Sequence, residues 1–173
     1  MKKPVLLFTI LLTALALLLI FWLCLESFPY LGVFRIEAVL GQSTPLISSI
    51  GPEVRTKLSG DYQTILESPV YFEFRALPWF THAQVSVTYE PTGGHDLVGL
   101  GRHTGPDFSY TVQAPTAILR ESEQTKKAIF DFDLSSFYQE KNMYRVLIDT
   151  TAHQYQVGSE LHIKEIKILL SRP

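Results

Sequence analysis

The residues best suited to contact a ligand lie in a short loop between two predicted strands. Trp79 and Phe80 follow Pro78, which lacks an amide hydrogen and therefore interrupts a strand. An exposed indole ring can stack on a sugar, because sugar CH groups pack well against an aromatic face. Alternatively, both rings fold back over the end of a sheet and belong to the core. Trp79 and Phe80 are therefore the candidate ligand-binding residues.

A second pair of candidate residues carries negative charge. Asp131 and Asp133 alternate with apolar residues, so on a strand they share one face and stand about 7 Å apart. With a nearby carbonyl they could hold a structural calcium ion, although calcium needs six to eight oxygen ligands. The same pair could serve as acid and base for glycoside cleavage, or simply form a solvated face. We expect no cofactor beyond this possible calcium.

Motifs of common catalytic centres are missing from the chain. The five histidines form no His-x-x-x-His pair, and no Gly-x-Ser-x-Gly motif occurs. The single cysteine, Cys24, lies in an apolar run and is not placed to act as a nucleophile. The sequence therefore predicts a protein that is not an enzyme.

Charge and composition limit the partners. The chain has 15 basic and 17 acidic residues, a formal net charge of −2, and after Leu25 its longest basic run is Lys126-Lys127. This balance excludes nucleic acid and disfavours other polyanions. Asn142, the only asparagine, is not in a glycosylation sequon, and no second cysteine exists to form a disulfide. These features favour a prokaryotic envelope protein.

An uncharged apolar run at residues 4–25 is preceded by Lys2 and Lys3 and followed by Glu26. It is long enough to cross a hydrocarbon core of about 30 Å. The run predicts a transmembrane signal anchor over residues 1–25, in contact with the lipid bilayer through residues 4–25, with a cytoplasmic N-terminus and a single-pass location in the cell membrane. The alternatives are a cleaved signal peptide and a lipid-modified Cys24, which Leu23 disfavours.

Period-2 alternation dominates the rest of the chain. We expect a juxtamembrane linker over 26–33 and an extracytoplasmic domain over 34–173. Asp61 to Ser68 could hold one or two helical turns, and a change of phase at Lys164-Glu165 predicts a β-bulge. The expected strands are 34–39, 70–76, 82–90, 97–101, 108–112, 117–119, 128–134, 144–148 and 162–170.

These strands predict an all-β fold, an antiparallel β-sandwich of jelly-roll type, preceded by one N-terminal transmembrane α-helix. The pair 70–76 and 83–90 resembles the opening of a jelly roll, and 144–148 with 161–168 resembles its end. In this organisation the chain is similar to galactose-binding-like domains, the fold of many carbohydrate-binding modules. The resemblance implies sugar binding through loop aromatics and often a structural calcium, but it assigns no residue.

The sequence therefore predicts a binding or surface-assembly module whose partner is a glycan or another envelope protein, bound by loops at one end of the sandwich. Two alternatives remain open. An apolar N-terminal helix before a β-domain also describes a pilin-like filament subunit. A cell-envelope hydrolase would instead need a pocket with convergent acids or a metal site.

Overall fold

The computed structural model describes residues 3–27, 32–151 and 160–172, and the chain divides into two compact units, Met1–Val33 and Phe34–Pro173. The first unit contains helix α1 (Lys3–Ser27), whose described side chains, at 10–22, are all exposed. Half of the predicted linker over 26–33, residues 28–31, lies outside the described residues.

No helix in the described part of the chain is both long and apolar enough to cross a membrane. This finding contradicts the predicted single-pass location in the cell membrane. It also leaves the predicted signal anchor and the bilayer contact through residues 4–25 without support.

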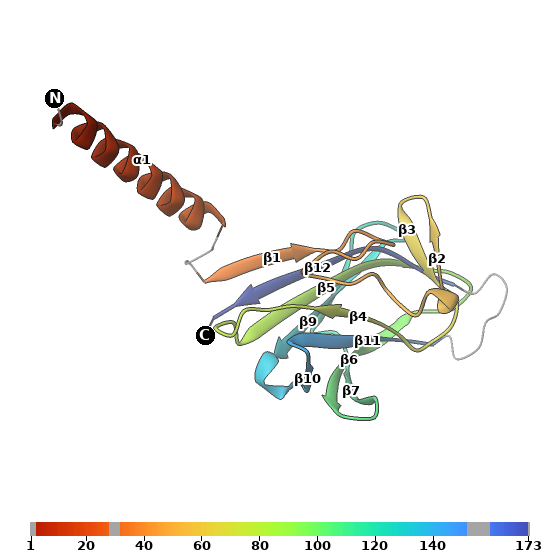
Figure 1. The fold of residues 1–173 in the computed structure, drawn as a ribbon. Helices are drawn as coiled ribbons and strands as arrows, with labels where there is room; N and C mark the ends of the chain where they lie inside the picture. The colour runs from red at the N-terminus through yellow and green to blue at the C-terminus, as the bar shows by residue number, and fades with distance from the viewer. Residues whose placement is uncertain (1–2, 28–31, 152–159, 173) are drawn as a thin grey trace. The chain divides into compact units, whose positions relative to one another are not determined.

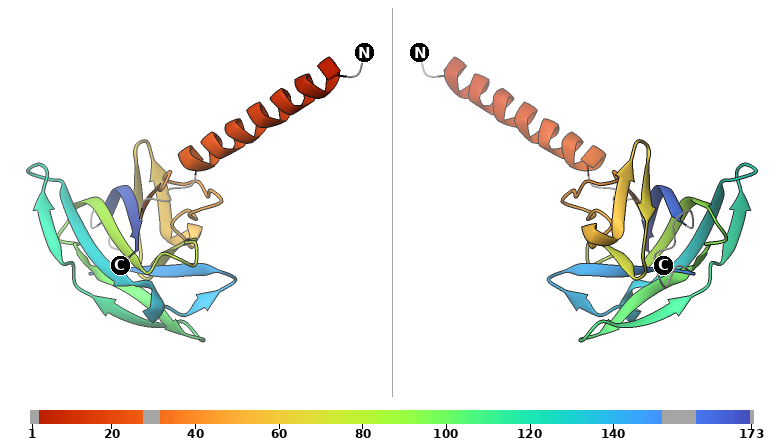
Figure 2. Two further views of the ribbon diagram at one scale, coloured as in Figure 1. Left: turned by 90° about the vertical axis from the view of Figure 1, so that its left-hand side faces the viewer. Right: turned by 90° about the vertical axis from the view of Figure 1, so that its right-hand side faces the viewer.

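The second unit is built from two antiparallel sheets, which Figures 1 and 2 show from three sides. Among the described residues, sheet A has seven strands and sheet B has five. Sheet A runs in the order β2 (Thr56–Ser59), β3 (Tyr62–Ile65), β12 (Leu161–Ser171), β5 (His82–Pro91), β9 (Lys126–Asp133) and β8 (Ala117–Arg120), with β1 (Val33–Glu37) also paired to β12. Sheet B runs β10 (Gln139–Glu140), β11 (Met143–Thr150), β6 (Leu97–Gly105) and β7 (Ser109–Gln113), with β4 (Val70–Phe74) also paired to β11. Two short 3₁₀ helices, η1 (Glu53–Arg55) and η2 (Leu134–Ser136), lie between strands.

The core forms where apolar side chains of both sheets meet. Phe72, Leu100 and Ile148 of sheet B and Phe130 and Ile166 of sheet A are all completely buried and belong to one cluster of described residues. Several of their neighbours along the strands, among them Glu73, Asp131 and Lys167, are polar and point away from the core, as expected when a sheet has one buried and one solvated face. The predicted all-β sandwich is therefore confirmed.

Aromatic rings connect the two sheets at one end of the sandwich. Phe132 of β9 meets Phe137 edge-on at 5.4 Å between ring centres, and Phe137 meets Tyr144 of β11 at 5.6 Å. Tyr144 in turn stacks on Phe74 of β4 at 5.3 Å. This continuous contact fixes the end of β9 relative to sheet B.

The strand predictions can be compared element by element. The alternation of Val70, Phe72 and Phe74 is confirmed, since all three are buried, and the predicted bulge near Lys164 appears as a register shift between Ile163 and Glu165. The helical turns expected over 61–68 are wrong, because that segment contains strand β3, paired to both β2 and β12.

The error over 61–68 has a physical cause in one side chain. Gln63 is only 3% exposed and its amide donates to the Ile50 carbonyl at 3.1 Å and to Thr56 Oγ1 at 3.0 Å. A buried amide is stable only when it has such partners. These partners come from distant segments, so the local sequence pattern does not show that β3 is an interior strand.

Candidate ligand-binding groove

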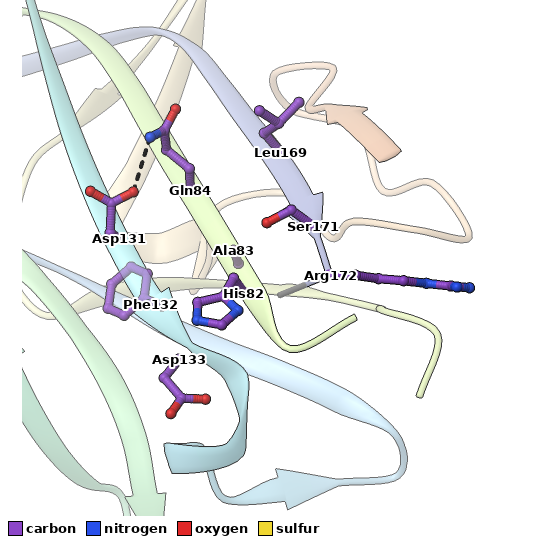
Figure 3. Close-up of a pocket in the computed structure, with 9 residues that line it drawn as sticks. All are labelled: His82, Ala83, Gln84, Asp131, Phe132, Asp133, Leu169, Ser171 and Arg172. Atoms are coloured by element: carbon purple, nitrogen blue, oxygen red, sulfur yellow. Dashed lines mark hydrogen bonds between the residues drawn. The ribbon is translucent and has the colours of Figure 1, made fainter. Parts of the chain in front are cut away.

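A groove of about 500 Å³ opens where β5 begins and where β9 and β12 end (Figure 3). It lies at one end of sheet A, on the face opposite the core. Its lining comes from all three strands and the residue that follows β12: His82, Ala83, Gln84, Asp131, Phe132, Asp133, Leu169, Ser171 and Arg172.

The register of sheet A arranges the outward lining, five polar side chains and Leu169, in two rows across three strands. In one row Leu169, Gln84 and Asp131 are directly opposite one another, and in the other Ser171, His82 and Asp133 are. Neighbouring strands are about 4.8 Å apart and the rows about 7 Å apart. The groove floor is therefore a grid of hydrogen-bonding groups on a rigid sheet.

Asp131 is held from two sides. The Gln84 amide donates to Asp131 Oδ1 at 2.9 Å, as drawn in Figure 3, and the Gln113 amide of β7 donates to the Asp131 main-chain carbonyl at 3.0 Å. The second bond links the end of sheet B to the groove strand. The bond from Gln84 restricts the Asp131 carboxylate before any ligand arrives, which lowers the entropy cost of binding, and the bond from Gln113 fixes the Asp131 main chain.

Asp133 is fixed by the helix that follows it. Its carboxylate accepts the Ser135 amide at 2.9 Å and so caps η2. Hydrogen bonds from the Ser135 side chain and main chain lower the pKa of Asp133, and the charges of His82 and Arg102 lower it further. Asp133 is therefore ionised at neutral pH and acts only as a hydrogen-bond acceptor.

The two predicted aromatic residues have different positions. Phe80 is 3% exposed, belongs to the core and stacks on Phe34, so a ligand cannot reach its face. Trp79 is 43% exposed, and the guanidinium carbon of Arg172 lies 5.7 Å from its ring centre. Because Arg172 also lines the groove, it connects the indole ring to the groove. Contact between Trp79 and a ligand stays a prediction.

The calcium hypothesis rests on Asp131 and Asp133, which lie on the same face of β9. Within residues 3–27, 32–151 and 160–172, no three His, Cys, Asp or Glu side chains gather closely enough to hold a metal ion. Each of the two carboxylates already accepts a hydrogen bond from the protein. The described residues therefore add no further acidic ligand for a calcium ion at Asp131 and Asp133.

Sequence reasoning missed the rest of the lining. Gln84, Ser171 and Arg172 lie far from Asp131 in the chain and join it only through the pairing of β5 with both β9 and β12. The outward positions of the predicted strand over 82–90 were the available signal, since His82 and Gln84 alternate with buried residues. Strand order was the missing information.

Comparisons with known proteins add two structural likenesses. No family model matches the chain, and no curated protein matches it. Among solved structures, the chain is similar to "xylan-binding module CBM15", with a TM-score of 0.46, 17% identity and coverage of 82% of this chain and 99% of that one. It is also similar to the CBM22-1 xylan-binding domain from Paenibacillus barcinonensis Xyn10C, with a TM-score of 0.41, 8% identity and coverage of 83% and 88%.

Proposed function

We propose that this protein is a non-catalytic carbohydrate-binding module that holds a neutral glycan in the groove of sheet A. The observation that carries the proposal is the grid of hydrogen-bonding side chains beside the half-exposed ring of Trp79. Sugar hydroxyls both donate and accept, so they match a carboxylate next to an amide, as at Asp131 and Gln84. The indole supplies the apolar face that a sugar ring also needs.

The charges of the groove favour a neutral ligand. Asp131 and Asp133 are on the floor, and Arg172 at the rim also faces the Trp79 ring. An anionic sugar would face two carboxylates, and like charges at an interface cost affinity. A neutral sugar meets no such repulsion, because its hydroxyls donate to the carboxylates.

Binding without cleavage is favoured by the ionisation of Asp133. A glycosidase needs one carboxylic acid whose pKa is raised, so that it still carries a proton near neutral pH. The hydrogen bonds from Ser135 move the pKa of Asp133 in the opposite direction. We therefore assign Asp133 the role of an acceptor for ligand hydroxyls.

A calorimetric titration with neutral oligosaccharides tests the proposal. Wild-type protein is expected to bind, and Trp79→Ala and Asp131→Asn are each expected to weaken binding by about tenfold, because each removes one contact worth about 1.4 kcal/mol. Asp61→Asn, an exposed aspartate in the turn between β2 and β3, is the matched control and should bind like wild type.

Two results would count against the groove. One is a wild-type protein that binds no neutral oligosaccharide from a broad panel. The other is unchanged affinity in both Trp79→Ala and Asp131→Asn, which would mean that the glycan binds to another surface of the protein.

A further inference from the structure

A second hollow, of about 360 Å³, lies on the face of sheet B opposite the core. Its walls include the rings of Tyr71, Phe108 and Tyr110 together with Leu147 and Arg55. Leu147 of β11 is directly opposite Tyr71 of β4, and both alternate with buried residues. This aromatic pocket is therefore a feature of the sheet surface and not a gap in the core.

An arginine packs against two of the rings. The guanidinium carbon of Arg145 lies 5.1 Å from the ring centre of Tyr71 and 5.4 Å from that of Phe108. Its charge is balanced by Glu73, with Nε and a terminal nitrogen each 2.6 Å from Oε1. Arg145 therefore packs against two of the rings that line the aromatic pocket, and its charge is balanced by Glu73.

Phe108 is presented to solvent by a strained turn. Its ring is 67% exposed, and its φ of +57°, after a φ of +64° at Asp107, is in the left-handed region that bulky residues rarely adopt. Such strain persists only where the surrounding structure enforces it and is common at binding sites.

One charged group at the aromatic pocket has no charged partner. Burial raises the pKa of the Tyr110 hydroxyl, so it keeps its proton, and it faces Arg145, whose hydrogen bond and charge lower that pKa. Arg55 donates to the Pro69 carbonyl at 2.9 Å, and no carboxylate of the described residues lies within ion-pair distance of it. A ligand that carries an anionic group would satisfy Arg55.

We propose that the aromatic pocket binds a sugar ring that carries a carboxylate, a hexuronic acid residue. The ring lies among Tyr71, Phe108 and Tyr110, and the carboxylate pairs with Arg55. A guanidinium matches a carboxylate in geometry and charge. This site goes beyond the proposed function, because it lies on the face of sheet B and selects an anionic ligand, whereas the groove of sheet A favours a neutral one.

Titration of the full chain with methyl glucuronide and with methyl glucoside, its neutral counterpart, tests the pocket. The glucuronide is expected to bind about tenfold more tightly or better, because one charge-assisted bond is added. Arg55→Gln should remove the difference and Arg55→Lys should restore part of it. Lys57→Gln, on the adjacent strand β2, is the matched control and should leave the difference intact.

Several outcomes would overturn the uronate site. These are equal binding of the two glycosides, no binding of either, or an unchanged preference in Arg55→Gln. If benzoate bound more tightly than methyl glucuronide, the ligand of the aromatic pocket would be an aromatic acid and not a sugar. A neutral-oligosaccharide titration on the same preparation separates this test from that of the groove, since either site can fail while the other binds.

Discussion

Replacing Phe130 with alanine is expected to lower the free energy of unfolding by about 3–5 kcal/mol. Phe130 is completely buried at the middle of β9, directly opposite Val85 of β5, and it stacks on Phe132 at 6.4 Å. Alanine there leaves a cavity that neighbours on a rigid sheet cannot fill, so both the transfer energy and the packing are lost. Urea unfolding followed by tryptophan fluorescence measures the change.

The same substitution at Phe108 is the control for this prediction. Phe108 is 67% exposed, and its main contact in the structure is with Arg145, so Phe108→Ala should cost less than about 1 kcal/mol. If Phe130→Ala were no more destabilising than Phe108→Ala, Phe130 would not be at the centre of the core.

Replacing Gly99 with alanine is expected to destabilise the fold by about 1–3 kcal/mol and to weaken glycan binding in the groove. A Cβ at Gly99 would lie 2.4 Å from the main-chain carbonyl oxygen of Gln113, and a carbonyl in a paired strand cannot easily move. Displacing Gln113 also disturbs the hydrogen bond from its amide to Asp131 on the groove floor. Denaturant unfolding and oligosaccharide titration of one preparation measure both effects.

Gly105, in the same strand, provides the matched glycine control. A Cβ there would have its nearest neighbour at 3.8 Å, an ordinary contact, so Gly105→Ala should change stability and groove binding little. A Gly99→Ala protein that matches Gly105→Ala in both measurements would show that β7 does not need the close approach to β6.

Whether a strand of this fold can be predicted from the sequence depends on whether one or both of its faces are buried. Strands β4, β5 and β9 have one buried and one solvated face, so their alternation is visible in the chain. Strand β3 buries the polar residues Gln63 and Thr64, so its pattern does not resemble that of a half-buried strand. The apolar run over 4–25 has no alternation and predicted a membrane span that the described structure does not contain.

The two candidate sites differ in how many of their residues could be predicted from the sequence. Asp131, Asp133 and Trp79 could be chosen from residue type and local pattern. The groove around them requires that β5 lie between β9 and β12, a property of strand order. The aromatic pocket is even harder to predict from the sequence, because Arg55, Tyr71 and Tyr110 come from three separate segments and no local motif links them.

The most direct test of the account is amide chemical-shift mapping of the isotope-labelled protein during titration with a neutral oligosaccharide. If the groove of sheet A holds the glycan, the largest changes fall on its two rows, at His82, Gln84, Asp131 and Asp133, and on the Trp79 indole. Changes confined to other surfaces, or no change with any neutral oligosaccharide, would contradict the claim that sheet A holds the glycan.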